Sequence, residues 1–192
     1  GTVEDQGDAF GDLGTLLILI VILVYIVMAT QFESLKFPFI IMFTIPFAFT
    51  GVFLALWMTS TPLSLIALIG AIMLVGIVTK NGIVMVDYMN LLIERGSGVF
   101  DAVIAGGKSR LRPVLMTSFT TILGMLPLAI GTGAGSETWQ PMGIAVIGGL
   151  TFSTILTLFI VPVLYSILVN RSQRKEREKL ACLSAEHQAS KH

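Results

Sequence analysis

The apolar residues of this chain fall into five long runs separated by short polar segments. The runs consist mainly of Leu, Ile, Val, Phe and Met, and each is about 20 residues or longer, the length at which an α-helix crosses a ~30 Å hydrocarbon core. They predict membrane-spanning helices over residues 13–32, 37–58, 63–92, 113–130 and 139–169. We therefore expect an all-α integral membrane protein, a five-helix bundle whose transmembrane domain covers residues 13–170.

The polar segments between these runs predict the connections. Residues 1–12 are expected to form a polar lead-in, residues 100–112 a partly amphipathic loop, and residues 171–192 a charged tail. Pro46 removes a backbone hydrogen bond inside the second run and predicts a bend there. Pro113 suits the first turn of the fourth helix.

Basic residues are confined to alternate connections. Of the 12 lysine and arginine residues, all except Lys80 lie in the first loop, the third loop or the tail. The positive-inside rule then places the N-terminus outside the cytoplasm and the C-terminus inside, which fits five spans. The chain begins with Gly1 and lacks the basic start of a signal peptide. We therefore expect this sequence to begin inside a longer protein.

Composition agrees with a membrane protein and argues against catalysis. Hydrophobic residues make up 54% and charged residues 12% of the chain, whereas an average soluble domain carries about 25% charged residues. The single cysteine, Cys182, and both histidines, His187 and His192, lie in the tail without neighbouring ligands. The chain also has no hydrolase motif at membrane depth. We expect no enzyme activity, no cofactor, no metal site and no nucleic-acid partner.

Lys80 is the residue that most needs an explanation. No charged residue occurs from position 37 to position 79, so its ammonium falls inside an apolar run. A lysine within the membrane costs at least about 2.5–3.5 kcal/mol and usually marks an ion or proton path. Asp87 lies on nearly the same helical face but about two turns, roughly 11 Å, further along the axis. We infer that the partner of Lys80 lies outside this chain.

Four other residues are candidates for roles near Lys80. Asn81 could orient the lysine, and Asp87 is as consistent with a hydrated polar position as with proton entry. Arg110, in the sequence RLRP, suits ordinary anchoring at the inner membrane surface. Thr117 and the hydroxyls that follow it could relay a proton, although such hydroxyls usually bond to their own helix carbonyls.

Four segments in the same order resemble resistance-nodulation-division transporters. They are YIVMATQFESLKFPFIIMFTIPFAFTG, IGAIMLVGIVTKNGIVMVDYMN, RLRPVLMTSFTTILGMLPLAIGTGAGSE and the glycine-rich last run ending FIVPVLYS. They are most similar to the hydrophobe/amphiphile multidrug efflux branch of acriflavine-resistance type. The resemblance covers about residues 8–171 and implies helices eight to twelve of such a pump.

The resemblance implies a mechanism and partners. Lys80 in GIVTKN matches the family's proton-relay lysine, whose partners are two aspartates on helix four of the other half. Arg110 and Thr117 match further relay positions of the family. The family implies proton-driven drug efflux in the bacterial inner membrane, with the N-terminus periplasmic. It also implies a homotrimer that works with a periplasmic adaptor and an outer-membrane channel, surrounded by membrane lipid.

Two alternatives stay open. A pump of the same superfamily could carry heavy metal ions, and metal exporters often have extra membrane methionines. The nine methionines here are spread along the sequence without an obvious facing pair, which favours drugs. The chain could instead be a truncated membrane protein that does not transport and interacts with a complete pump.

Overall fold

The computed structural model describes the backbone of residues 2–189 and the side chains of residues 3–172 and Arg174. This part of the chain is helical throughout apart from short turns, and five helical segments are long and apolar enough to cross a membrane. The prediction of an all-α membrane bundle is therefore confirmed. The helices are α1 (Thr2–Phe32), α2 (Lys36–Met42), α3 (Thr44–Met58), α4 (Leu65–Glu94), α5 (Val99–Ile130) and α6 (Ser136–Ala189).

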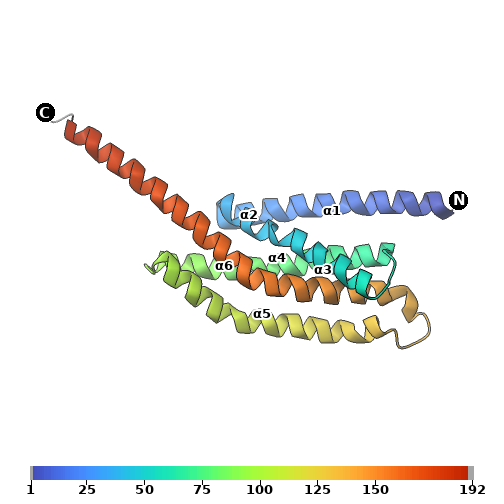
Figure 1. Ribbon diagram of the computed structural model, residues 1–192. Helices are drawn as coiled ribbons and strands as arrows, with labels where there is room; N and C mark the ends of the chain where they lie inside the picture. The colour runs from blue at the N-terminus through green and yellow to red at the C-terminus, as the bar shows by residue number, and fades with distance from the viewer. Residues whose placement is uncertain (1, 190–192) are drawn as a thin grey trace.

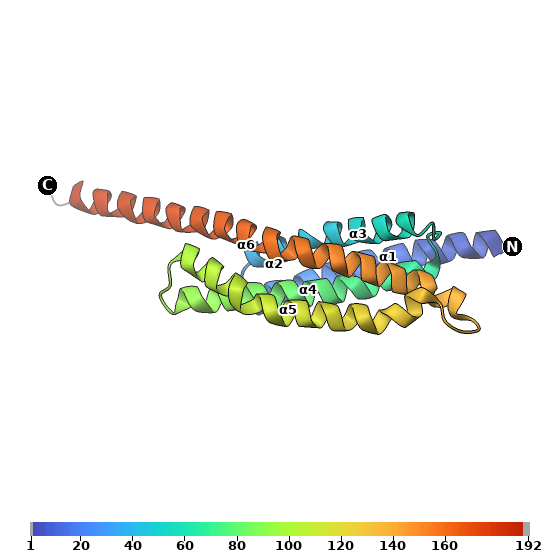
Figure 2. The same cartoon turned by 60° about the horizontal axis from the view of Figure 1, so that its bottom comes forward.

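Helix α6 lies at the centre of the bundle, packed against α3, α4 and α5 (Figure 1). Helix α1 runs along one edge and contacts only α2 and α4 among the described helices. The turned view in Figure 2 shows α5 and α6 side by side on the face opposite α1. The turns after α1 and α4 lie at one end of the bundle with the extension of α6, and the turns after α3 and α5 lie at the other (Figure 1).

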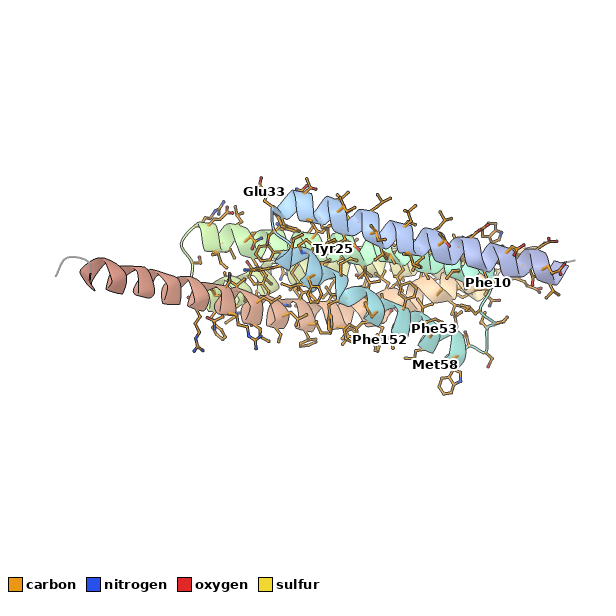
Figure 3. All side chains as sticks on the ribbon, turned by 90° about the horizontal axis from the view of Figure 1, so that it is seen from above. Phe10, Tyr25, Glu33, Phe53, Met58 and Phe152 are labelled. Carbon is orange, nitrogen blue, oxygen red and sulfur yellow. The ribbon has the colours of Figure 1, made fainter. Side chains whose placement is uncertain are left out.

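Close contact between α3 and α6 depends on glycine. A Cβ atom added to Gly148 would lie 2.1 Å from the Cβ of Ala55, and one added to Gly149 would lie 2.1 Å from Leu74 Cδ2. Small residues of this kind let helix backbones approach closely in a membrane. The contact forms part of one buried cluster, whose other members include Val52 and Leu150. Phe53 and Met58 lie on the outer surface of α3 (Figure 3).

A second buried cluster lies nearer the end from which α6 projects. Tyr165 is its largest side chain and is fully buried. Its hydroxyl donates a hydrogen bond to Asn90 Oδ1, and its ring stacks on Phe37 with the centroids 5.5 Å apart. Tyr165 thus connects α6 to α4 and to α2.

Pro46 and a glycine-rich segment account for two interruptions of the helices. The bend expected from Pro46 occurs as a break at Phe43, between α2 and α3. Pro46 has no N–H to bond the carbonyl of Met42, which is the last residue of α2. The glycine-rich segment after α5 is a loop, and Gly131, which ends α5, takes the left-handed conformation that favours glycine.

Helix boundaries differ from the predicted ones where polar residues were expected to end a helix. The expected lead-in, residues 1–12, is helical from Thr2, with Glu4 and Asp5 in the first turn where acidic side chains favour a helix. The expected second helix, residues 37–58, is divided into α2 and α3. The third, expected over residues 63–92, begins two residues later because the side chain of Ser64 caps it by accepting a hydrogen bond from Ala67 N–H at 3.2 Å.

The largest differences concern the last two helices. The segment 100–112 is not a loop, because α5 begins at Val99 and continues through Pro113 to Ile130, in place of the expected 113–130. Helix α6, expected over residues 139–169, begins at Ser136 and continues through most of the charged tail. Residues 190–192, and the side chains of Cys182 and His187, lie outside the described part of the chain.

Candidate functional site

Lys80 lies in the middle of α4, at an exposed position beside α1. It lines an open groove of about 360 Å³ whose other walls are almost entirely apolar. Among the side chains that the structure describes, none forms a hydrogen bond or an ion pair with its ammonium. The groove residues besides Lys80 are Leu23, Val24, Val27 and Met28 of α1, and Gly76, Thr79, Ile83 and Val84 of α4.

Lys80 belongs to an exposed stripe along α4. Met73, Gly76 and Asp87 are exposed at helical spacing on the same side. Asn81, the next residue of α4, lies about 100° further round the helix and is 9% exposed, and no hydrogen bond joins it to Lys80 within the described residues. The stripe is the side of α4 that the rest of the described chain leaves open, which fits the inference that Lys80 has its partner elsewhere.

Arg110 lies in the part of α5 that was expected to be a loop. Its side chain is half-buried, and its guanidinium carbon lies 4.6 Å from the ring centroid of Tyr88 on α4, a cation–π distance. Its Nε atom is buried and has no hydrogen-bond partner among the described residues. The sequence pattern does not indicate Tyr88, because its contact with Arg110 depends on how α4 and α5 are rotated against each other.

Thr117 is exposed on α5 and donates its hydroxyl to the carbonyl of Pro113 at 2.8 Å. Thr120 and Thr121 also bond to carbonyls of their own helix, as such hydroxyls usually do. Ser118 differs, because it is buried and lies 2.9 Å from the hydroxyl of Thr154 on α6.

The relay residues implied by the resemblance are not joined to one another. Within the described side chains, no hydrogen bond or ion pair links Lys80, Arg110 and Thr117, and Asp87 pairs with none of them. Each of the three therefore remains available to a group supplied from outside this segment.

Three of the methionines do come together. Met28 from α1 and Met85 and Met89 from α4 are buried in one cluster, and Met42 packs against it. Folding brings α1 and α4 side by side and so places methionines that are far apart in the sequence in the same buried cluster. Their neighbours in the cluster are other apolar side chains.

Residues 1–169 match the sequence profile of the AcrB/AcrD/AcrF family. The cobalt-zinc-cadmium resistance protein CzcA of Cupriavidus metallidurans is 39% identical over 176 residues, which are 92% of this chain and 17% of that protein. The multidrug resistance protein MdtC of Erwinia amylovora is 44% identical over 155 residues, which are 80% of this chain and 15% of that protein.

A solved structure is also similar to this chain. A crystal structure of a heavy metal efflux pump is similar over 88% of this chain and 17% of its own, with a TM-score of 0.79 and 32% identity. The chain spans 15–17% of the length of these relatives, whose names include both metals and drugs. The drug-efflux branch therefore stays a prediction. The chain belongs to the AcrB/AcrD/AcrF family of resistance-nodulation-division transporters.

Proposed function

We propose that this chain is the C-terminal membrane portion of a proton-driven efflux transporter and supplies the lysine side of its proton relay. The observation that carries the proposal is the environment of Lys80. An ammonium in an apolar groove at membrane depth, without a partner among the described side chains, needs an anionic group from another segment.

In this proposal the partner is an aspartate pair in the N-terminal half of the pump. In a medium of low dielectric, a carboxylate attracts the Lys80 ammonium far more strongly than it would in water. A proton arriving from outside the cytoplasm neutralises the carboxylate and removes that attraction. The released ammonium and the helix that carries it then shift, and loss of the proton to the cytoplasm restores the pair.

Arg110 and Thr117 act in the same relay. A guanidinium stays charged throughout the cycle, so Arg110 can stabilise the ionised carboxylates without exchanging a proton itself. Thr117 can exchange its bond to the Pro113 carbonyl for one to a water or a carboxylate, because a hydroxyl both donates and accepts. Asn81 and Asp87 are accessory candidates in this scheme.

The complete pump is proposed to be a homotrimer in the bacterial inner membrane. The N-terminus of this chain would face the periplasm and the C-terminus the cytoplasm. The trimer would dock to a periplasmic adaptor and an outer-membrane channel. Support comes from the segregation of basic residues to alternate connections and from membership of the family.

The test is a chimeric pump in which this chain replaces the matching segment of the Erwinia amylovora MdtC protein. Ethidium efflux and proton uptake are measured in cells that lack their own pumps. The chimera should transport, Lys80→Ala should abolish both activities, and Lys108→Ala, an exposed lysine of α5, should leave them intact.

Two outcomes would contradict the proposal. Full transport by the Lys80→Ala chimera would exclude a relay role for this lysine. Efflux by the 192-residue chain alone would mean that Lys80 finds its partner within this sequence or a second copy of it. If the chain alone is inactive and instead lowers transport by a co-expressed complete pump, the alternative of a non-transporting interaction partner is favoured.

A heavy metal cargo is the second candidate, because one relative is a cobalt-zinc-cadmium resistance protein and because Met28, Met85 and Met89 share one buried cluster. Thioethers are soft ligands that suit Cu(I). A chimera that protects cells from copper, and loses that protection in a Met85→Leu variant while keeping proton uptake, would favour the metal cargo. Protection from ethidium alone, unaffected by Met85→Leu, would favour drugs.

A further inference from the structure

The Arg110 guanidinium lies over the ring of Tyr88, a residue without a role in the relay proposed above. We propose that Tyr88 is a positioning residue, whose ring face holds the Arg110 guanidinium in place and leaves its terminal nitrogens free for a carboxylate. This inference rests on the proposed role of Arg110 and adds a residue to it.

The first support is the lack of other partners. Arg110 Nε is buried and has no hydrogen-bond acceptor among the described residues, and no carboxylate in that part of the chain pairs with the guanidinium. The ring of Tyr88, with its centroid 4.6 Å away, is the favourable contact that the structure gives this cation. A cation over an aromatic face is attracted by the negative potential of the ring, and the attraction grows as water is removed.

The second support is that the packing of α4 against α5 fixes this geometry. Gly106 lies one turn before Arg110 and packs directly on Met89, the neighbour of Tyr88. A Cβ atom at Gly106 would lie 2.7 Å from Met89 Cγ, so the helices are as close here as glycine allows. Ala102, one turn earlier, is fully buried on the same face of α5.

The third support is the direction in which the site remains open. Asp87, next to Tyr88, is exposed on the same stripe of α4 as Lys80. The ring contact therefore holds a cation at the edge of the face where the proposal places the aspartate pair. A guanidinium that stacks through its plane keeps its in-plane donors available for bidentate bonding to a carboxylate.

The test uses the chimeric pump, with ring chemistry varied at position 88. Tyr88→Phe keeps the ring face and should transport as the parent does. Tyr88→Leu keeps apolar bulk but has no ring face, and ethidium efflux should fall roughly three- to tenfold. The matched control is Tyr25→Leu, which makes the same change at a half-buried tyrosine whose hydroxyl bonds to the carbonyl of Leu35.

Phenylalanine analogues with increasing ring fluorination, placed at position 88, distinguish a positioning role of the ring from a role in packing alone. Fluorine withdraws negative potential from the ring face and changes its shape little, so transport should fall stepwise in the Arg110 parent. In an Arg110→Lys background, which retains charge without the planar group, the dependence on fluorination should be clearly weaker. A flat response to fluorination in the parent would overturn the role of Tyr88.

The Arg110→Ala variant separates failure of the proposed relay role of Arg110 from failure of the positioning role of Tyr88. If Arg110→Ala leaves proton-coupled efflux unchanged, Arg110 is not part of the relay and the inference about Tyr88 falls with it. If Arg110→Ala abolishes efflux while the Tyr88→Leu and fluorinated variants match the parent, only the positioning role is wrong.

Discussion

Replacing Gly148 with alanine tests whether the α3–α6 contact holds the bundle together. The new Cβ would lie 2.1 Å from the Cβ of Ala55 and 3.0 Å from the carbonyl oxygen of Gly51. An ordinary contact begins near 3.4 Å, so the shortfall against Ala55 is about 1.3 Å. Neither neighbour is the end of a flexible side chain, so the two helices must move apart.

The expected cost follows from two opposing effects. Overpacking of a well-packed interface costs about 1–3 kcal/mol. Alanine is a better helix former than glycine by about 0.5–1 kcal/mol, which offsets part of that cost. We therefore expect Gly148→Ala to lower the free energy of unfolding by about 1–2 kcal/mol.

The measurement is an SDS titration of the full chain in dodecyl maltoside micelles, monitored by tryptophan fluorescence. Gly124→Ala is the matched control, because Gly124 is a helical glycine on α5 and an added Cβ there meets nothing within 4 Å. The control should unfold at the same SDS fraction as the parent or slightly higher. If Gly148→Ala unfolds together with the control, the close approach of α3 and α6 does not limit stability and the packing argument fails.

Three further predictions use the same chain. Tyr165→Phe removes the hydroxyl bond to Asn90 and should lower the free energy of unfolding by about 0.6 kcal/mol, a typical value for a hydrogen bond between membrane helices; an unchanged SDS midpoint would contradict this. Ser153→Ala removes a buried hydroxyl that has no partner among the described residues, so stability should stay the same or rise, and a loss above about 1 kcal/mol would indicate a missed partner. With Cys182 replaced by serine, a cysteine at Ser60 should react with an impermeant maleimide in intact cells, whereas one at Ser97 should react only after permeabilisation. The reverse pattern would refute the proposed orientation.

The sequence predicted the number of spans and the lack of a partner for Lys80 among the described side chains, because both follow from the length of apolar runs and the position of charges along them. The extension of α5 was missed since polar residues were interpreted as a loop. A signal was nevertheless present: Ala102, Gly106 and Arg110 recur at intervals of four, which places them on one face of a helix.

The contacts between helices could not be derived in the same way. The stacking of Arg110 on Tyr88 and the clustering of Met28 with Met85 each require the relative rotation of two helices. That rotation is set by local steric contacts such as Gly106 against Met89. Sequence periodicity identifies which residues share a face of one helix but not which face of another helix they meet.

The two walls of the Lys80 groove differ in how much of the described chain packs against them. The α4 wall belongs to a helix packed against α3, α5 and α6, whereas α1 contacts only α2 and α4 among the described helices. Met28 is the only buried residue among positions 3–32, so the rest of the described chain covers little of α1. A sideways displacement of α1 would change the width of the groove, and within the described chain the buried contact that resists it is that of Met28 with the cluster around Met85 and Met89.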